Sequence, residues 1–183
     1  QYALAFNYLG QPIIFLTAAG IAGDPALNAA EDARSALIGT NAAKQKVLKK
    51  FSITTAPFRD FVPVIRYAEI LLNYAEAATN TDDFTMAKTL LAAVRNRSDP
   101  NYIFKSEEVD TKEALLTAIW KERDIELLGE GFRLMDLQRR LQTLPSKKGS
   151  IGTAPLVLVS SNNYIWPIPS GEISANKLMV PNP

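Results

Sequence analysis

The chain has 183 residues, 47% of them hydrophobic and 21% charged, so it is long enough and apolar enough to bury a core of its own. Its 20 basic and 19 acidic residues leave a formal net charge of +1, and we therefore expect no nucleic-acid partner. Cysteine and histidine are both absent, which excludes disulfides, thiolate and imidazole metal ligands, and the usual nucleophile and general base. We expect no metal, no cofactor and no catalytic residue.

The first third of the chain carries mixed patterns. Residues 1–24 are apolar and rich in glycine, which predicts short segments, and they lack an initial methionine, as expected of a piece of a longer protein. A capping aspartate, a proline and several alanines predict a helix over about 25–37, and a second short helix is expected near 41–50. Over 49–63, β-branched residues, aromatics and two prolines favour extended chain. No apolar run reaches the roughly 20 residues that a membrane-spanning helix needs.

The strongest helical pattern lies in the middle of the chain. Apolar side chains recur at spacings of three and four over 64–80, which predicts a helix with one buried face made by Ile65, Ala68, Leu72, Ala75 and Ala78. A short polar turn separates it from a second predicted helix over about 84–98. Residues 63–97 therefore predict a helical hairpin the size of one tetratricopeptide-like unit, which needs neighbours to cover its apolar faces.

A kinked helical segment is expected over residues 111–142. Its first part, about 111–128, begins at a capping residue and should bury Leu116, Ile119, Trp120 and Leu127. Gly129 and Gly131 would each cost about 1 kcal/mol inside a helix, so they predict a break before a further helix over about 131–142. The remaining residues carry clustered glycines and prolines, which predict a flexible connection, a short strand-like piece and an irregular tail.

Four motifs follow one another along the chain and cover most of residues 60–176. They are VIRYAEILLNYAEA at 64–77, AAVRNR at 92–97, IWKERDIELLGEGFRLMDLQR at 119–139 and WPIPSGEISAN at 166–176. In their order and spacing they resemble the C-terminal part of the SusD/RagB family of outer-membrane nutrient-binding lipoproteins. Four motifs in order are much more specific than any one of them.

This resemblance implies a mainly α fold, in which the tetratricopeptide-like helix pair packs with the kinked segment, irregular loops and a proline-rich tail. It implies a single domain over 1–183 that is the C-terminal part of a longer protein. Such a protein would lie on the outer face of a bacterial outer membrane, bind a glycan or other nutrient without catalysis, and deliver it to a SusC-like TonB-dependent transporter. Its membrane association would come only from a lipid anchor that this chain lacks.

The densest mixture of charges lies in residues 119–140, and two hypotheses account for it. The glutamates spaced four apart fit the carboxylate pair of a glycosidase, but neighbouring arginines should lower their pKa values, which is the wrong direction for a general acid. The favoured hypothesis is a structural ion-pair network that ties the kinked segment to its neighbours. Its expected members are Arg66, Glu69, Glu76, Glu122, Arg123, Glu126, Arg133 and Asp136.

Ligand-binding residues are expected in loops, where aromatic rings can stack on the apolar faces of sugars and amides can bond to hydroxyls. The candidates are Asn101, Tyr102, Asn163 and Tyr164. Trp120 and Trp166 lie inside the family-like motifs and are expected in the core. Two alternatives to nutrient binding remain open: a helical-repeat adaptor that binds another protein, and, as the weaker one, a carboxylate-based glycosidase.

Overall fold

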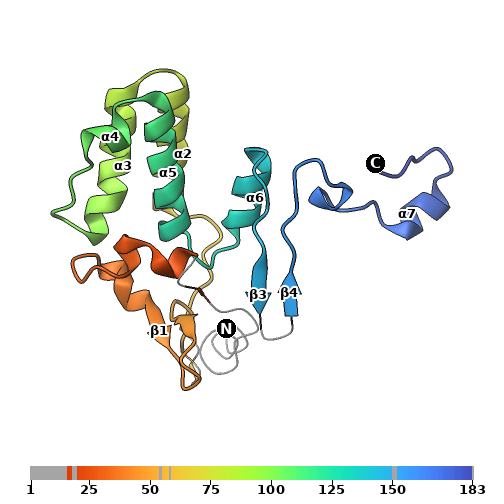
Figure 1. The fold of residues 1–183 in the computed structure, drawn as a ribbon, viewed down its shortest axis with the longest axis horizontal. Helices are drawn as coiled ribbons and strands as arrows, with labels where there is room; N and C mark the ends of the chain where they lie inside the picture. The colour runs from red at the N-terminus through yellow and green to blue at the C-terminus, as the bar shows by residue number, and fades with distance from the viewer. Residues whose placement is uncertain (1–15, 18–19, 54, 58, 150–151, 183) are drawn as a thin grey trace. The chain divides into compact units, whose positions relative to one another are not determined.

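The computed structural model describes residues 16–182 apart from 18–19, 54, 58 and 150–151. Its regular structure is mainly helical, which confirms the expected fold class (Figure 1). Contacts divide the chain into two compact units, unit 1 over residues 1–132 and unit 2 over residues 133–183. Within the described residues, no helix is long and apolar enough to cross a membrane.

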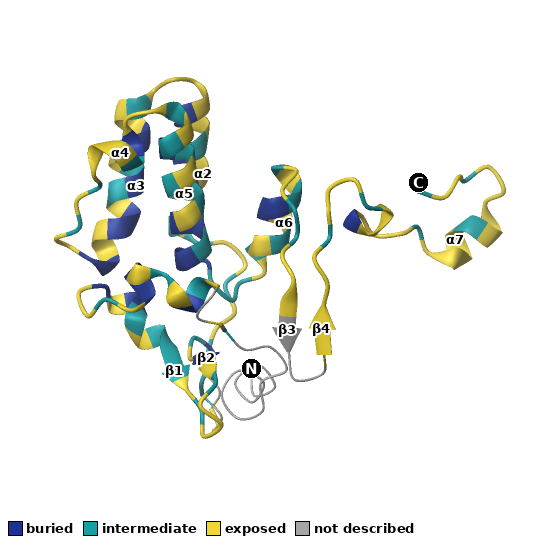
Figure 2. Cartoon of the chain, viewed as in Figure 1, coloured by how far each residue is buried: buried dark blue, intermediate teal, exposed yellow. Residues whose placement is uncertain are grey.

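Unit 1 is built on helices that pack side by side. They are α2 (Tyr67–Asn80), α3 (Phe84–Ser98) and α5 (Lys112–Glu126), with the short α4 (Ser106–Val109) ahead of α5 (Figure 1). Side chains three and four residues apart point to the same side of a helix, so the apolar sides of the helices meet in one core. Its buried members are Leu72, Ala75, Ala78, Ala87, Leu91, Val94, Val109, Leu115 and Ile119. Figure 2 shows that buried and exposed positions alternate along these helices in the way this packing requires.

Two details of the predicted helices are wrong. Ile65 was expected on the buried face, but α2 begins only at Tyr67, so Ile65 lies in the bend before the helix and is 72% exposed. In α5 the fully buried leucine is Leu115, one position before the predicted Leu116, which is only partly buried. Neighbouring side chains on a helix point about 100° apart, so both can fall within a broad apolar stripe, and contact with α2 and α3 decides which one is fully buried.

The turn between α2 and α3 stops one helix and starts the next. The Asp83 side chain accepts a hydrogen bond of 3.1 Å from the backbone N–H of Met86, and so satisfies one of the free donors at the start of α3. We expect Asp83→Ala to lower the free energy of unfolding by about 1 kcal/mol in urea denaturation. Asp83→Asn should retain most of the stability, because an amide oxygen also accepts this bond. A full loss in both variants would contradict capping by this hydrogen bond.

The two helices predicted before residue 50 are wrong. The structure has single 3-10 turns at η2 (Ile21–Gly23), η3 (Pro25–Leu27) and η4 (Ala33–Leu37). An antiparallel hairpin of β1 (Ile38–Thr40) and β2 (Lys46–Leu48) follows. The short segments expected over residues 1–24 lie mostly outside the described residues.

Side-chain bonds to the backbone explain why a continuous helix does not form there. Asn28 donates from its amide to the carbonyls of Ala22 and Asp24, at 2.9 and 2.8 Å, which closes the first turns on themselves. Asp32 then accepts from the N–H of Arg34 at 2.9 Å and starts a separate turn. Alanine content favours helix only weakly, and these local bonds together with the burial of Asp32 and Arg34 outweigh it.

The predicted break at the glycine pair is present. Helix α5 ends at Glu126. Gly129 and Gly131 have φ values of +80° and +90°, a backbone conformation that residues other than glycine rarely adopt. Helix α6 (Phe132–Arg139) follows and ends three residues before the predicted limit, where Leu141 has a φ of +50°. The two glycines therefore separate the helices by turning the backbone.

Unit 2 contains regular structure that the sequence patterns missed. It has the antiparallel pair β3 (Lys147–Gly149) and β4 (Gly152–Ala154), the turn η5 (Asn162–Tyr164) and helix α7 (Ser170–Ala175). Pairs this short are decided by their partner strand and carry little periodicity of their own. Trp166 was expected in the core, but it is 81% exposed, so that prediction is wrong.

Candidate functional site

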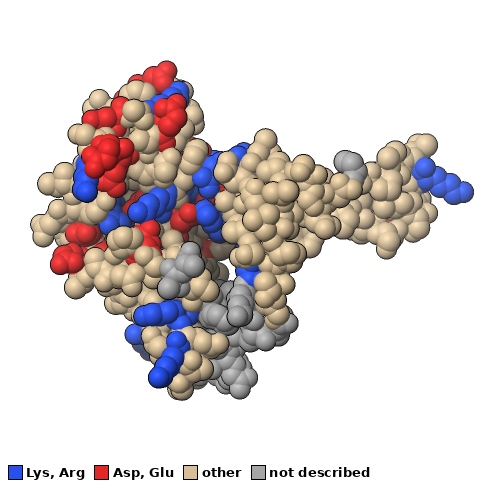
Figure 3. All heavy atoms as spheres, in the orientation of Figure 1, with Lys and Arg blue, Asp and Glu red and all other residues tan. Residues whose placement is uncertain are grey.

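Charged side chains with long sequence separation converge where the C-terminal ends of α3 and α5 and the start of α2 meet residues 32–50. We call this group the ion-pair network. Its members are Asp32, Arg34, Lys50, Arg66, Arg95, Arg97, Glu122, Glu126 and Glu130. On the face shown in Figure 3, acidic side chains gather over the end of the helices near α4, and basic ones over the β1–β2 hairpin.

Arg34 is the most deeply held cation of the network. It donates from Nε and Nη2 to the two carboxylate oxygens of Asp32, at 3.0 and 2.8 Å. From Nη1 it donates to Glu122 at 2.6 Å and to Glu126 at 3.1 Å. All four side chains are buried, so ion pairs and hydrogen bonds within the group must replace the hydration that each charge has lost.

Glu126 joins three arginines from three parts of unit 1. It accepts from Arg34, from Nη1 of Arg66 and from Nη2 of Arg97, the last at 2.7 Å. Glu130 accepts from Nε of Arg66 at 2.8 Å and from the Lys50 ammonium. The break after α5 brings Glu130 back towards the same cations, although it lies outside the helix.

Arg66 and Lys50 also bond to the backbone at the end of α5. Arg66 donates to the carbonyl of Glu126, and Lys50 donates to the carbonyls of Glu126 and Leu128, each at 3.3 Å. The last carbonyls of a helix lack partners within it and carry partial negative charge, so cations there stabilise the helix end. The network thus caps α5 as well as neutralising its carboxylates.

Burial and ion pairing shift two of the carboxylate pKa values in opposite directions. Burial raises the pKa of Glu122, and the neighbouring Arg34 and Arg95 offset only part of that rise. At Glu130 burial also acts to raise the pKa, but hydrogen bonds from Arg66 and Lys50 outweigh it, and the pKa is lowered. The arginines do act to lower the pKa of Glu122, but the expected net lowering is wrong there, because the cost of removing its charge from water is larger.

These opposite shifts predict opposite effects on acid stability. The lowered pKa of Glu130 means that its contribution to stability is present above its unfolded pKa and is lost as the pH falls through the folded value. For Glu122 the pKa is raised, so proton uptake favours the folded state and stability is gained as the pH falls. In urea denaturation from pH 6 to pH 3, we expect Glu130→Gln to lose less stability on acidification than the parent protein, and Glu122→Gln to lose more. The same slope in both variants would contradict this assignment.

The other residues expected in the network take different places. Arg123 donates to the amide oxygen of Asn73, and its guanidinium carbon lies 6.0 Å from the centre of the Phe132 ring. Glu69 has one buried carboxylate oxygen with no hydrogen-bond partner among the described residues. Glu76 lies half-buried on α2.

Two further expected members lie in unit 2. Asp136 is buried and pairs with Arg139 at 2.9 Å, and its backbone carbonyl accepts from Nε of Arg140 at 2.7 Å. Arg133 lies on the exposed side of α6.

Six members of the network are absent from the expected set. They are Glu130, Asp32, Arg34, Lys50, Arg95 and Arg97. The last two lie inside the AAVRNR motif, and its two arginines could have indicated partners for the glutamates. Asp32 and Arg34 had no such indication, because Arg34 reaches Glu122 and Glu126 across separations of 88 and 92 residues.

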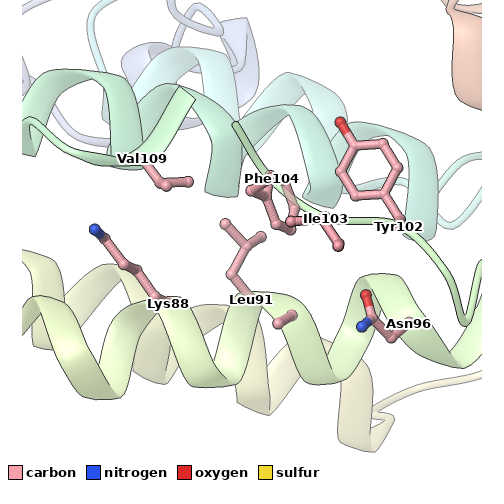
Figure 4. Close-up of a pocket in the computed structure, with 8 residues that line it drawn as sticks. Lys88, Leu91, Asn96, Tyr102, Ile103, Phe104 and Val109 are labelled. Carbon is pink, nitrogen blue, oxygen red and sulfur yellow. The ribbon is translucent and has the colours of Figure 1, made fainter. Parts of the chain in front are cut away.

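Two of the pockets that the described residues form lie in unit 1. The first, the aromatic pocket, has a volume of about 300 Å³ and lies between α3 and the segment that leads to α4 (Figure 4). Its lining residues are Lys88, Leu91, Ala92, Asn96, Tyr102, Ile103, Phe104 and Val109. The second, the basic pocket, has a volume of about 380 Å³ and opens beside the ion-pair network.

The model of the SusD family matches residues 45–183. The chain belongs to the SusD family. Among solved structures, it is 33% identical to a SusD superfamily protein from Bacteroides fragilis, with a TM-score of 0.73; the match covers 95% of this chain and 40% of that one. A SusD superfamily protein from Bacteroides thetaiotaomicron is 26% identical, with a TM-score of 0.67, over 86% of this chain and 39% of that one.

A third structural match is described as a candidate sugar binding protein, from Bacteroides vulgatus. It is 26% identical, with a TM-score of 0.66, over 84% of this chain and 36% of that one. This SusD-family chain thus spans about two fifths of the length of the solved relatives. No curated protein matches it significantly.

In this SusD-family chain, three of the four motifs contribute residues to the ion-pair network. Arg66 comes from the first, Arg95 and Arg97 from the second, and the glutamates from the third. The arrangement holds helices together through buried, mutually neutralised charges. It offers neither two accessible carboxylates nor a free base, because the side chains of Glu126 and Glu130 are each only 1% exposed.

The two pairs of ligand-binding candidates belong to different units of the chain. Tyr102 lines the aromatic pocket, where its ring meets Phe104 edge to face at 4.9 Å and the Arg95 guanidinium at 4.0 Å, with Asn101 exposed beside it. Tyr164 lies in unit 2, is 6% exposed, and donates its hydroxyl to the carbonyl of Gln142 at 2.7 Å. Asn163 beside it is exposed. Tyr164 therefore packs within unit 2 and presents no open ring face to a sugar.

Proposed function

We propose that the protein containing this chain is a cell-surface nutrient-binding protein of the bacterial outer membrane. It binds a glycan or other nutrient and delivers it to a SusC-like TonB-dependent transporter. The observation that carries the proposal is membership of the SusD family over residues 45–183, and similarity to a candidate sugar binding protein supports a glycan as ligand. The chain spans only part of such proteins, so the proposal concerns the complete protein.

Binding without catalysis fits the carboxylates of unit 1. A glycosidase needs an acid and a second carboxylate on either side of a substrate bond, in a site that the sugar can enter. Glu122 has a raised pKa, as a general acid would, but it is buried and bonded to Arg34 and Arg95. It lines neither the aromatic pocket nor the basic pocket, so neither of these gives a sugar access to it.

A glycan array followed by calorimetry on the complete protein tests this proposal. We expect micromolar to millimolar binding of one glycan class, no turnover of the bound glycan, and recovery of a TonB-dependent transporter when the protein is purified from its native membrane. Absence of both a glycan and a transporter would overturn the proposal. Turnover that disappears in a folded Glu122→Gln variant would instead favour the glycosidase.

A second candidate function, binding of another protein, is favoured by the apolar outer side of α2 and the segment before it. Val64, Ile65 and Tyr67 are 86%, 72% and 75% exposed in this chain. Exposed apolar side chains in one stretch commonly mark a protein contact. Capture of a protein partner that persists without any glycan, together with an empty glycan array, would favour this adaptor function.

A further inference from the structure

The basic pocket in unit 1 carries an excess of positive charge. Its lining residues are Arg34, Leu37, Lys50, Phe51, Arg59, Asp60, Phe61, Pro63, Arg66, Arg97, Glu126 and Glu130. Five of these are cations and three are carboxylates, although the chain as a whole is nearly neutral. The pocket therefore has a local charge that the overall composition does not show.

The opposite charges of this pocket lie at different depths. The carboxylates of Glu126 and Glu130 are only 1% exposed, whereas the side chains of Lys50, Arg66 and Arg97 are 20%, 22% and 60% exposed. An entering ligand can contact the exposed cations directly, whereas the carboxylates of Glu126 and Glu130 are buried and already paired with cations. The third carboxylate, Asp60, is partly exposed and accepts a hydrogen bond of 2.6 Å from the N–H of Ile53. A ligand that enters this pocket therefore meets the exposed cations before Glu126 and Glu130.

Two of the arginines have donors to spare. Among the described residues, Arg97 uses only Nη2, in its bond to Glu126, and Arg59 is exposed and makes no hydrogen bond or ion pair. Arg66 and Lys50, in contrast, already donate to three acceptors each. A planar guanidinium offers two parallel N–H groups to an acidic group, so Arg59 and Arg97 are suited to bind one.

An apolar wall stands beside these donors. The Phe61 ring is 83% exposed, and Pro63 and Leu37 line the same pocket. An exposed aromatic ring is a stacking surface for the C–H face of a sugar, and covering the ring is favourable because it removes apolar surface from water. The pocket thus combines an anion-binding side with a face suited to a sugar ring.

From this combination we infer that the basic pocket binds an anionic sugar residue of a glycan, with Arg59 and Arg97 on its acidic group and Phe61 on its ring. The inference rests on the proposed glycan-binding function and names the class of glycan. A uronic acid carboxylate and a sulfate ester present the same charged oxygens to the two arginines. The volume of about 380 Å³ suits one such residue and leaves the rest of the glycan outside.

The test is calorimetry on the complete protein with four oligosaccharides of equal length. They are oligogalacturonate, its methyl-esterified neutral form, a sulfated galactose oligosaccharide and the unsulfated parent. We expect at least one acidic form to bind about tenfold or more tightly than its neutral counterpart, since a charge-assisted contact contributes about one factor of ten. Whichever acidic form binds identifies the acidic group, and its Kd should rise with added salt.

The variants connect binding to this pocket. Arg59→Gln and Arg97→Gln should each raise the Kd of the acidic glycan about tenfold, and both side chains are exposed enough for the protein to stay folded. Lys105→Gln removes the same charge from a side chain that is 74% exposed and outside the pocket, and it should leave the Kd unchanged. Equal binding of neutral and acidic forms, or acidic binding that neither arginine variant changes, would overturn the inference and leave glycan binding in place. Failure of all glycans, including those of the array, would overturn the proposed function and this inference with it.

Discussion

Glu126→Ala is expected to lower the free energy of unfolding by about 3–5 kcal/mol, the usual effect of removing one partner from a buried group of ion pairs. Glu126 accepts from Arg34, Arg66 and Arg97, and its side chain is 1% exposed. Without it, Arg34 and Arg66 keep other carboxylate partners, but each loses an acceptor that is almost fully buried. This loss is a large part of the 5–15 kcal/mol that stabilises a typical domain.

Urea denaturation followed by circular dichroism measures the effect, and Arg97→Ala is the matched control. Arg97 takes part in the same carboxylate contact, but its side chain is 60% exposed and can be replaced by water. Its removal should cost about 1 kcal/mol or less. If the two variants lost equal stability, the depth of the carboxylate would not explain the effect of Glu126, and the network would act as an ordinary surface group of charges.

Gly129→Ala should lower the free energy of unfolding by about 2–4 kcal/mol, from a strained backbone and an overfilled core together. Gly129 has a φ of +80°, which alanine adopts only at a cost. A Cβ at this position would also lie 2.3 Å from Cδ2 of Leu48, a side chain that is 1% exposed in β2. Leu48 has little room to move, so the backbone after α5 would have to shift.

Gly131→Ala is the control that separates strain from contact. Gly131 has a φ of +90° but no atom within 4 Å of an added Cβ, so its replacement should cost only the backbone strain of about 1–2 kcal/mol. Thermal denaturation compares the two. In a Leu48→Ala background, the additional cost of Gly129→Ala should fall to that of Gly131→Ala. A cost that stayed unchanged in that background would show that Leu48 is not the obstacle.

Some residues of the candidate site could be predicted from local sequence patterns, and others depend on contacts between distant segments. Glu122 and Glu126 of α5 could be selected from the sequence, because charges four residues apart on a helix share a face, whereas Arg95 and Arg97 of AAVRNR were missed. The cations that neutralise them from outside the helices could not. Tyr102 lines a pocket as its loop position suggested, whereas Tyr164, chosen by the same argument, is buried by contacts within unit 2.

What the sequence determined by itself is the helical hairpin of α2 and α3, helix α5, the break at Gly129 and Gly131, and the four motifs typical of the SusD family. Each of these depends on residues a few positions apart, where spacing, capping and backbone freedom act directly. Only the tertiary structure decided the turns and hairpin before residue 50, the exposure of Trp166, and the place of Arg34 between Glu122 and Glu126. These depend on contacts between distant segments. Because Arg34 is buried, its charge must be paired, but no local sequence pattern predicts which carboxylates will pair with it.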